Sequence, residues 1–420
     1  MRVVYDISVL GQGHASPGYR TGLFRAVESV ARGLADSGAC ELAFSALHSD
    51  RTALDASEYL RTAAFPGEPA LVPPHAAHGA VEGMIRAYRS LMRRTGAPLA
   101  ARVARRLLRH AIPLAETALG MAAPVHVPPC DVFHSPRFPL PRRGRTGRAA
   151  RVLTVYDLIP LRLPRLYPGS IIAEMERIVR SLRPDDWALV ISDWTRADLC
   201  EHRPDLDPSR VSVTHLAADP ALFHRVEDAE KVAEVRARYG IPAGPYLLSL
   251  NTADPRKNMG RALAAFARAV EAERVPHSFV LVGYRSAALE RLLEQGAARG
   301  RVHLAGYVAD GDLAALYSGA TAFVFPSLYE GFGLPPLEAM RCGVPVIASS
   351  TTSLPEVVGD AGILVDPADT DALADAIARV CRDDGLRQCL REKALLRAAA
   401  FSWERSVAQT LAAYRAALGG

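Results

Sequence analysis

The 420-residue sequence contains no uninterrupted apolar run of the about 18 residues that a membrane-spanning helix requires. Its N-terminus also lacks a basic region followed by an apolar core, so a secretory signal is not indicated. The six cysteines are scattered without Cys-x-x-Cys spacing, which favours ordinary reduced thiols over a disulfide framework or a zinc site. These absences predict a cytoplasmic protein without a membrane span.

Motifs of several common enzyme classes are absent as well. There is no Walker loop and no Gly-x-Ser-x-Gly nucleophile elbow, and after Gly11 and Gly13 the third glycine of a dinucleotide-binding fingerprint is missing. Two Asp-x-Asp pairs, at 205–207 and 369–371, have the form used by metal-dependent transferases of a different fold. The first lies in a proline-flanked loop and the second opens a helix, so we interpret them as turns or caps. Because no cluster of metal ligands accompanies them in the sequence, we expect no metal and no resident cofactor.

Acidic residues are missing from two stretches of a chain whose net charge is only +5. The stretch from Gly83 to Ala115 combines arginines with apolar residues at roughly helical spacing, which predicts a basic amphipathic helix. The second stretch, Arg137 to Arg151, is an arginine-rich loop that contains proline and glycine. In the first stretch the arginines are Arg86, Arg89, Arg93, Arg94, Arg102, Arg105, Arg106 and Arg109, and the interleaved apolar residues are Leu99, Val103, Leu107 and Leu108.

Two interpretations of these basic stretches stay open at this point. One is a solvated face of an arginine-rich protein. The other is peripheral contact, through Arg86 to Arg109, with anionic lipid headgroups at the inner face of the cytoplasmic membrane or with a pyrophosphate-bearing acceptor. Nucleic acid is disfavoured as a partner, because no aromatic stacking motif accompanies the charge.

Strands that alternate regularly with helices predict an α/β protein with parallel sheets covered on both faces. The first series opens with a strand at 2–10, a loop at 11–18 and a helix from about 21 to 34. Its later strands are predicted at 151–156, 187–192 and 211–216. The second series has predicted strands at 246–250, 278–283, 302–306, 322–325, 344–348 and 362–366.

A connector at about 219–230 separates the two series, so we predict two similarly built domains. The N-terminal Rossmann-like domain would span residues 1–222 and the C-terminal Rossmann-like domain 223–400. The final segment, 401–420, is predicted to be an amphipathic helix that crosses back to the N-terminal domain. Its aromatic residues Trp403 and Tyr414 would pack at the junction.

The most informative segment runs from Phe323 to Gly343 and combines a strand, a glycine-bracketed loop and a helix. Gly331 and Gly333 allow the backbone to approach a ligand closely, and the two prolines that follow suit the first turn of a helix. The unpaired amides at such a helix start form an anion site. The segment also carries two carboxylates, Glu330 in the loop and Glu338 in the helix, which we expect to serve different parts of one elongated ligand.

A second candidate site follows the predicted strand that ends at Leu250. In open α/β sheets, ligands bind at the carboxyl ends of the strands. Asn251 begins this loop, and the adjacent Arg256 and Lys257 would match a diphosphate, the arginine through its planar fork and the lysine as a compact charge. A solvated turn is the alternative, but the pair recurs at the same predicted sheet edge as the glutamate loop.

These motifs resemble a known family. The Arg-Lys pair, the segment Glu-Gly-Phe-Gly-Leu-Pro-Pro-Leu-Glu at 330–338 and the ending Ser-Leu-Pro-Glu-Val-Val-Gly-Asp-Ala-Gly-Ile-Leu-Val-Asp-Pro at 353–367 are similar to retaining nucleotide-sugar glycosyltransferases. The family is glycosyltransferase family four (group 1), of the bacterial polysaccharide biosynthesis type. The resemblance is strong over 245–410 and weaker before that, where 156–160, 192–199 and 216–223 match family segments. It implies a GT-B architecture, with two Rossmann-like domains facing each other across a cleft.

Carried over residue by residue, the resemblance implies that Arg256 and Lys257 bind the donor diphosphate and that Glu338 binds the ribose hydroxyls. Glu330 would hold hydroxyls of the transferred sugar. The amides of Phe332, Gly333 and Leu334, beside Gly331, would lie near the sugar and the phosphates. A carboxylate is an acceptor-only group that suits diols, and positive charge suits a leaving diphosphate. On this account Glu330 positions the sugar and is not a nucleophile.

The chain departs from the family pattern in its N-terminal half. Tyr156, followed by Asp157, stands where many members have a histidine that contacts the donor sugar, and tyrosine cannot supply a cation near neutral pH. His134 ends a strand-like run and either substitutes for that histidine or is a structural histidine. The segment Arg20-Thr21-Gly22 lies near a helix start, where the family places backbone next to the donor phosphates. A plain helix N-cap is the alternative for this segment.

The resemblance thus implies a retaining, metal-independent glycosyltransferase, in which the C-terminal domain binds a nucleotide-sugar and the N-terminal domain admits the acceptor. The donor would be GDP-mannose or a UDP- or dTDP-sugar. The acceptor would be a glycan or lipid-linked oligosaccharide of bacterial surface-polysaccharide assembly. One alternative is a non-catalytic nucleotide-sugar or polysaccharide-binding protein of the same fold. A glycoside hydrolase with Glu330 and Glu338 as its carboxylate pair is another, and it would leave the phosphate-binding features without a purpose.

Overall fold

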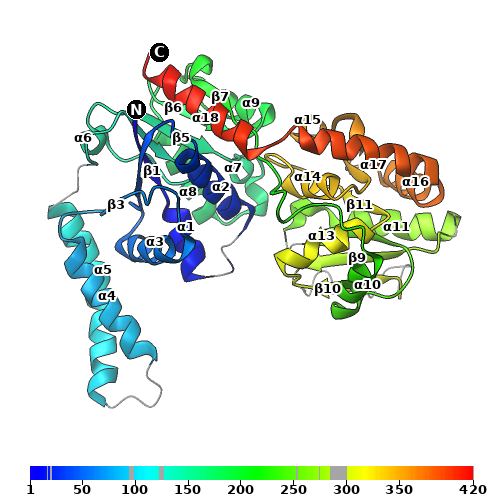
Figure 1. The fold of residues 1–420 in the computed structure, drawn as a ribbon, viewed down its shortest axis with the longest axis horizontal. Helices are drawn as coiled ribbons and strands as arrows, with labels where there is room; N and C mark the ends of the chain where they lie inside the picture. The colour runs from blue at the N-terminus through cyan, green and yellow to red at the C-terminus, as the bar shows by residue number, and fades with distance from the viewer. Residues whose placement is uncertain are drawn as a thin grey trace.

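The computed structural model describes residues 1–16, 18, 21–93, 99–122, 127–251, 254–273, 275–283 and 300–419. They form two parallel sheets, each with helices packed on its faces, placed side by side (Figure 1). This is the α/β architecture that the alternation of strands and helices predicts. None of the helices in the described ranges combines the length and the apolar composition needed to cross a bilayer.

The first sheet has seven parallel strands in the order β3-β2-β1-β4-β5-β6-β7. The order reverses at β1 and β4, which is the kind of position where open α/β sheets bind ligands. The strands are β1 (Arg2–Asp6), β2 (Glu41–Ser45), β3 (Leu71–Val72), β4 (Val132–Ser135), β5 (Ala150–Val155), β6 (Trp187–Val190) and β7 (Val211–Val213). The helices are α1 (Ser8–Ala15), α2 (Gly22–Asp36), α3 (Asp50–Ala63), α4 (His78–Arg93), α5 (Leu99–Ala122), α6 (Arg143–Thr146), α7 (Ile159–Arg162), α8 (Gly169–Arg180) and α9 (Asp193–His202).

The second sheet has six parallel strands in the order β10-β9-β8-β11-β12-β13. Each of the six strands predicted for the second series is present, within about two residues at its ends. They are β8 (Tyr246–Asn251), β9 (Ser278–Gly283), β10 (Val302–Gly306), β11 (Ala322–Phe325), β12 (Val346–Ser349) and β13 (Gly362–Val365). The helices are α10 (Ala229–Arg238), α11 (Met259–Glu273), α13 (Asp310–Gly319), α14 (Leu334–Arg341), α15 (Leu354–Val358), α16 (Thr370–Arg382) and α17 (Asp384–Ala399).

The last helix, α18 (Trp403–Ala417), lies against α2 and the strands β5 and β6 of the first sheet. Its buried residues Val407, Leu411 and Tyr414 belong to the hydrophobic core around β1 and α2. Trp403 packs against the cores of both domains. The helix therefore joins the end of the chain to the first domain after the second domain is complete.

The start of the chain differs from its prediction. Residues 2–10 are not one strand, because β1 ends at Asp6 and helix α1 occupies most of the predicted loop. The glycines that indicated a loop instead let α1 pack closely on two helices: a Cβ at Gly11 would lie 2.4 Å from the carbonyl oxygen of Thr52 on α3, and a Cβ at Gly13 would lie 2.2 Å from the ring of Phe24 on α2. Glycine at a helix contact and glycine in a loop are indistinguishable in the sequence.

The acid-free stretch from Gly83 to Ala115 is also not a single helix. It is divided between α4 and α5, which form a hairpin that projects from the first domain (Figure 1). Part of the predicted basic face is paired: Arg86 binds Glu82 on its own helix at 2.7 Å, and Arg89 binds Asp55 on α3 at 2.7 Å. Apolar side chains remain exposed on the hairpin, namely Met92, Val103, Leu107 and Leu114.

The two Asp-x-Asp pairs serve as the predicted caps. Asp207 accepts a hydrogen bond from the amide of Ser209, and Asp369 accepts from the amides of Asp371 and Ala372 at the start of α16.

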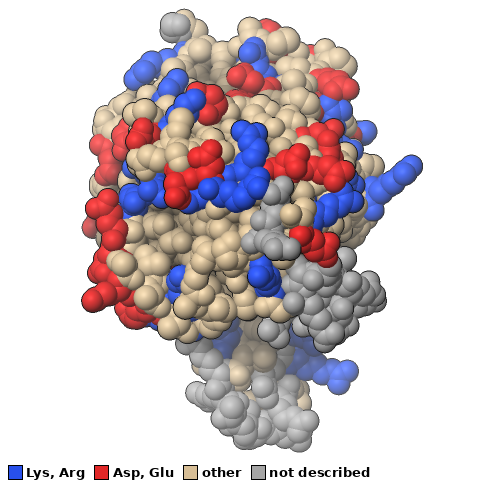
Figure 2. Space-filling view, turned by 90° about the vertical axis from the view of Figure 1, so that its right-hand side faces the viewer, with Lys and Arg blue, Asp and Glu red and all other residues tan. Residues whose placement is uncertain are grey.

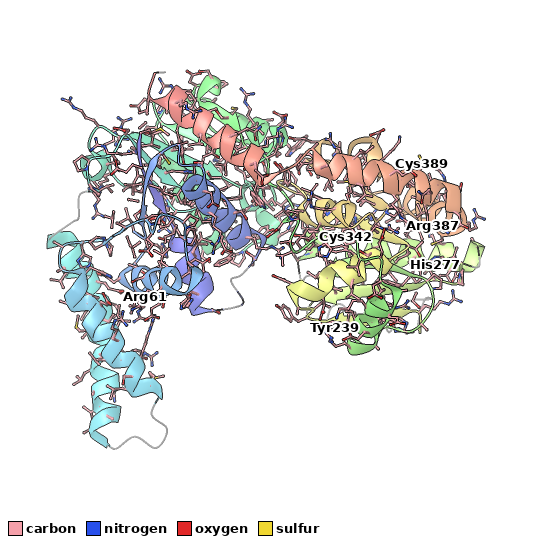
Figure 3. All side chains as sticks on the ribbon, in the orientation of Figure 1. Arg61, Tyr239, His277, Cys342, Arg387 and Cys389 are labelled. Atoms are coloured by element: carbon pink, nitrogen blue, oxygen red, sulfur yellow. The ribbon has the colours of Figure 1, made fainter. Side chains whose placement is uncertain are left out.

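The six cysteines are free. Two of them in the second domain are labelled in Figure 3, the buried Cys342 and the exposed Cys389. On the outer face of this domain, acidic and basic side chains are interspersed (Figure 2), as is usual for a solvated surface.

Candidate functional site

A cavity of about 630 Å³ lies between the two domains. Its walls come from the carboxyl ends of β5 and β8, from the N-terminus of α2 and from the loop that connects β11 to α14. Parallel strands direct their carboxyl ends to one edge of a sheet, and here the edges of both sheets open toward the cavity. Its size is in the range of cavities that enclose small organic ligands.

The loop between β11 and α14 is held against the first domain at Gly331. A Cβ at this position would lie 2.6 Å from the carbonyl oxygen of Tyr156 and 2.7 Å from the Cβ of Asp157, so only glycine allows this approach. From the first domain, Ser192 and Thr195 donate hydrogen bonds to the Gly331 carbonyl oxygen, at 2.7 and 3.1 Å. The predicted close backbone approach at this glycine is therefore to the other domain.

Helix α14 begins directly after this loop. Gly333 precedes it with a φ of 116°, in the left-handed region that favours glycine, and the prolines occupy the first turn as predicted. Phe332, Gly333 and Leu334 line the cavity. Because Pro335 and Pro336 carry no N–H group, the backbone donors that remain for an anion at this helix start are the amides of Gly333 and Leu334.

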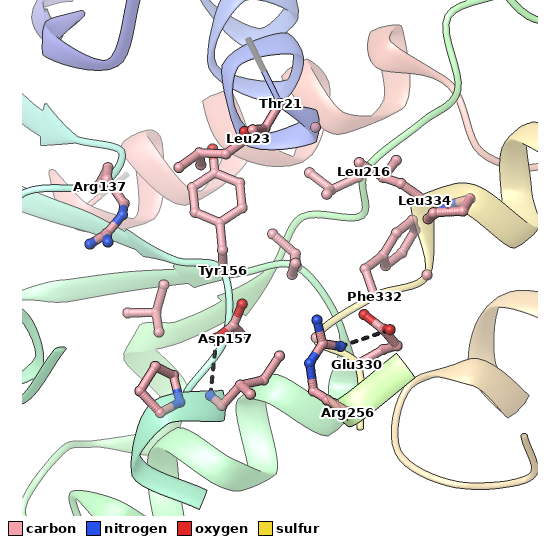
Figure 4. A pocket seen from close by; sticks show the side chains of 18 of the residues that line it. Thr21, Leu23, Arg137, Tyr156, Asp157, Leu216, Arg256, Glu330, Phe332 and Leu334 are labelled. Carbon is pink, nitrogen blue, oxygen red and sulfur yellow. Dashed lines mark hydrogen bonds and ion pairs between the residues drawn. The ribbon is translucent and has the colours of Figure 1, made fainter. Parts of the chain in front are cut away.

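Arg256, Lys257 and Glu330 form a buried ion cluster at the cavity wall; Figure 4 shows the pair of Arg256 and Glu330. The Glu330 Oε1 atom lies 2.7 Å from the guanidinium of Arg256 and 2.7 Å from the ammonium of Lys257. Asp254 also binds Arg256, at 3.2 Å. Burial alone would raise the pKa of Glu330, but the two cations lower it below its ordinary value. Glu330 is therefore an ionised hydrogen-bond acceptor.

Glu338 is buried in helix α14 and lies at another part of the same cavity. Its Oε1 accepts a hydrogen bond of 2.8 Å from Arg25 on α2, so the ion pair links the two domains. Tyr317 donates to its other oxygen at 3.4 Å. Burial raises the pKa of Glu338, and the single arginine reverses only part of that effect. The two glutamates thus differ: Glu330 is paired with two cations of its own domain, whereas Glu338 is paired with one cation of the other domain.

Tyr156 and Asp157 follow β5 and contribute to the first-domain wall (Figure 4). Burial raises the pKa of both side chains. Asp157 accepts a hydrogen bond of 3.0 Å from the amide of Ile159 at the start of α7. The carboxyl of Asp157 also interacts electrostatically with Arg256 and Glu330. The structure therefore brings Tyr156 and Asp157 to the same cavity as the ion cluster.

Part of the first-domain segment that was predicted to place its backbone beside the donor phosphates, Arg20 to Gly22, lies at the cavity. Thr21 and Gly22, at the start of α2, line it. Thr21 precedes the helix without capping it through its side chain, so the first helical amides are open to another acceptor. Arg20 lies outside the described residues. Asn251 ends β8, and its side chain is likewise outside the described part of the chain.

The environment of His134 does not suit a residue that would replace the family histidine at the donor sugar. It is 1% exposed and does not belong to the cavity wall. Its Nδ1 lies 2.5 Å from the hydroxyl of Tyr414 and its Nε2 lies 2.7 Å from the hydroxyl of Thr154. Burial lowers its pKa to about 3. The structure therefore corrects the ligand hypothesis: His134 is a structural histidine that attaches helix α18 to the first sheet.

Several residues at the site were not identified from the sequence. Arg25 reaches Glu338 across 313 positions of the chain, and nothing local distinguishes it from any arginine on an amphipathic helix. Arg137 lines the cavity, and its only signal was membership of the second acid-free stretch. Ser192 and Thr195 fell within a family-like segment, but their contact with the opposite domain required the fold.

Comparisons with known proteins agree with this architecture. Residues 232–397 match the family model described as "Glycosyl transferases group 1". The chain is 37% identical over 288 residues to O-antigen chain mannosyltransferase B of Escherichia coli, covering 68% of this chain and 74% of that protein. Among solved structures, sucrose-phosphate synthase of Thermosynechococcus elongatus aligns with a TM-score of 0.65 at 21% identity, over 99% of both chains. HepE of Anabaena, solved with UDP and glucose, aligns with a TM-score of 0.62 at 14% identity, over 98% of this chain and 99% of its own.

The two facing parallel-sheet domains, with the ion cluster at the cavity between them, define a glycosyltransferase of the GT-B fold. The chain belongs to the group 1 glycosyl transferases, as its relatives and the matched family model show. The structural likenesses, all at low identity, establish the fold.

Proposed function

We propose that this protein transfers a hexose, with mannose as the leading candidate, from a nucleotide-diphosphate sugar to a hydroxyl group of a glycan or lipid-linked oligosaccharide in bacterial surface-polysaccharide assembly. GDP-mannose is the favoured donor, since the relative with 37% identity is a mannosyltransferase of O-antigen chains. A UDP- or dTDP-sugar is the alternative donor. The observation that carries the proposal is the buried cluster of Arg256, Lys257 and Glu330 at the cavity wall.

The cluster suits the diphosphate of such a donor. Arg256 and Lys257 place two fixed positive charges where the leaving diphosphate gains negative charge during the transfer, and preorganised charges of this kind stabilise a transition state strongly. The amides of Gly333 and Leu334, just before the two prolines of α14, add neutral donors on the same side. Because these groups are already in position, binding requires little reorganisation. In this proposal they also take the role that a metal ion has in other transferases, so the reaction needs no metal.

The two glutamates orient the donor. Glu338 accepts hydrogen bonds from the ribose hydroxyls, and Glu330 accepts from hydroxyls of the sugar. Since Lys257 and Arg256 lower the pKa of Glu330, it stays ionised and cannot act as the general acid of a glycoside hydrolase. The donor and Arg25 both bind Glu338, so donor binding alters a contact between the domains.

The first domain would present the acceptor. In the proposed mechanism the acceptor hydroxyl attacks from the same face that the diphosphate leaves, and the departing phosphate takes its proton, which retains the anomeric configuration. Tyr156 offers a hydroxyl to the donor sugar, and Asp157 lies next to the ion cluster. The contact of Gly331 with Tyr156 closes the cavity on this side, which excludes water and limits hydrolysis.

The hairpin of α4 and α5 is the surface that we propose for contact with an anionic membrane or a lipid-linked acceptor. On α5 the arginines Arg106 and Arg109 are exposed, and so are Leu107 and Leu114, at 66% and 71%. Basic and apolar groups side by side on one helix are typical of interfacial binding. Reversing the charge of Arg106 and Arg109 should weaken binding to anionic vesicles, and unchanged binding would count against this contact.

The donor can be tested by thermal shift with GDP-, UDP- and dTDP-sugars, because a ligand that binds only the folded state raises the melting temperature. We expect GDP-mannose to give the largest shift, and Lys257→Ala to abolish it. A sugar-binding protein would show the shift without acceptor-dependent release of nucleoside diphosphate. If no nucleotide-sugar changes the melting temperature, the transferase proposal fails.

A further inference from the structure

A second group of chemically distinctive side chains lies away from the cavity, at the base of the α4/α5 hairpin. Asp50 is the first residue of α3, His78 is the first residue of α4, and His75 lies in the segment between β3 and α4. His75 Nε2 is 2.9 Å from Asp50 Oδ2, and His78 Nδ1 contacts Asp50 Oδ1. The candidate ligand atoms of these residues all lie within 4.8 Å of one another. None of the three residues lines the cavity described above.

The fold holds these side chains firmly. Asp50 and His75 are each 3% exposed, and His78 is half-buried. Asp50 is fixed at the start of α3, where the hydroxyl of Ser49 caps the helix by accepting from the amide of Thr52. The segment that carries His75 and His78 follows the edge strand β3. The three groups therefore converge from two separate connections of the first sheet.

Two buried polar atoms beside this cluster have no hydrogen-bond partner among the described residues, namely Nδ1 of His75 and Oε1 of Glu116 on α5. Burial raises the pKa of Glu116, the charge and the backbone amide of Arg51 oppose this rise, and Asp50 and His75 also act on it electrostatically. When Nε2 of a histidine binds a metal ion, Nδ1 keeps a proton and becomes a donor that usually finds a carboxylate. Metal binding would thus turn the two unpaired atoms into a complementary donor and acceptor.

We propose that Asp50, His75 and His78 bind a divalent transition-metal ion, zinc being the ion that this ligand set fits best. Two imidazoles and a carboxylate are common zinc ligands, and water would complete the coordination. The sequence did not indicate this site, because its ligands come from two different connections and include no cysteine. The role of the ion is structural and separate from sugar transfer.

The ion would brace the hairpin against the first domain. The hairpin base has only a small hydrophobic core, whose buried members are Leu54, Val81, Ile85 and Ile112. The ligands come from α3, from α4 and from the segment just before α4, so one ion would connect the hairpin to the body of the domain. Since binding to the folded state alone stabilises a protein, the ion would oppose local opening of the hairpin.

The test uses the full-length protein, stripped with a chelator and dialysed. Zinc should bind at one ion per chain by elemental analysis, raise the melting temperature and slow proteolysis within the hairpin. His75→Gln and His78→Gln should each abolish stoichiometric binding, and Glu116→Gln should weaken it about 10- to 100-fold. His110→Gln, which changes an exposed histidine on the same hairpin, is the matched control and should bind normally.

Cobalt(II) added to the wild-type protein gives a readout that does not depend on the folding of any variant. Visible absorption typical of a low-coordinate cobalt site is expected, and zinc should displace it. The proposal is overturned if zinc does not bind at one ion per chain, or if the two histidine variants bind it as the wild type does. It is also overturned if the hairpin is stabilised only by protonation below about pH 6.5, the ordinary pKa of histidine, and not by metal.

Discussion

The two domains present different chemistry to the cavity that they share. The second domain contributes fixed, paired charges, since Arg256 and Lys257 converge on Glu330. The first domain contributes backbone, the start of a helix and polar side chains that include Tyr156 and Asp157, whose pKa values are raised by burial, and the arginines Arg25 and Arg137. We propose that the second domain binds the charged part of the donor through Arg256 and Lys257, whereas the first domain shapes the space for the acceptor.

Removing a cation from the second domain should have the largest effect. In Lys257→Ala the leaving diphosphate loses a preorganised positive charge, so we expect kcat to fall by about 10²- to 10³-fold. Steady-state kinetics with donor and acceptor measure this. Lys393→Ala is the matched control, because Lys393 pairs with the exposed Asp360 on the surface. A loss of the same size in Tyr156→Phe would break the proposed division between the domains.

The second largest loss of activity is expected for a substitution at Gly331, where the two domains are in contact. Gly331→Ala places a methyl group where the carbonyl oxygen of Tyr156 lies 2.6 Å away, so the loop or the domain must shift. A displacement of about 1 Å at a catalytic site can lower activity about 10²-fold, and we expect a loss of that order in kcat/KM. Gly311→Ala, at a helical glycine with open space around its Cβ, is the control. Near-normal activity in Gly331→Ala would show that the domains do not act together as described.

Glu338→Gln should act mainly on donor binding. The substitution removes a charged acceptor for the ribose, and hydrogen bonds to charged groups contribute about 1.5–3 kcal/mol, so donor affinity should fall about 10- to 100-fold. Isothermal titration with the donor measures it. In a double-mutant cycle with Arg25→Ala, the two changes should be non-additive, because the side chains bind each other. Additive effects would indicate that the ion pair does not contribute to donor binding.

The smallest predicted effect concerns the attachment of α18 to the first domain. Burial lowers the pKa of His134 to about 3, whereas the unfolded chain has an ordinary value of about 6.5. Between pH 7 and 5 only the unfolded state gains this proton, so the free energy of unfolding should fall by about 2 kcal/mol. Chemical denaturation at several pH values measures this loss. His134→Gln should reduce the dependence, and the exposed His110→Gln should not; equal slopes in all three proteins would refute the assignment.

The two domains also differ in how much of their structure could be predicted from the sequence. In the second domain each strand is an apolar run that precedes a recognisable turn, so all six strands and the ion cluster could be located. In the first domain, β2 and β3 were not assigned, β4 was noted only as the strand-like run that ends at His134, and the glycines of α1 favoured a loop. A sequence window cannot reveal why these glycines are needed, since the reason is the packing of α1 on α3 at Gly11 and on α2 at Gly13.

Contacts over long sequence separation account for the remaining differences. His134 was a candidate ligand because it ends a strand, but Tyr414, 280 residues later, covers it. The Arg25–Glu338 pair and the Asp50, His75 and His78 group also form only when distant connections meet. Local motifs therefore identified the second-domain residues that line the cavity, whereas the contacts across it depend on tertiary structure.

The most direct test of the central claim is release of nucleoside diphosphate by the purified protein, measured with each nucleotide-sugar in the presence and absence of a glycan acceptor. We expect rapid release with GDP-mannose only when acceptor is present, and a loss of this release in Lys257→Ala and Glu330→Gln but not in Lys393→Ala. Release that is independent of acceptor, or that persists in Lys257→Ala and Glu330→Gln, would contradict the central claim.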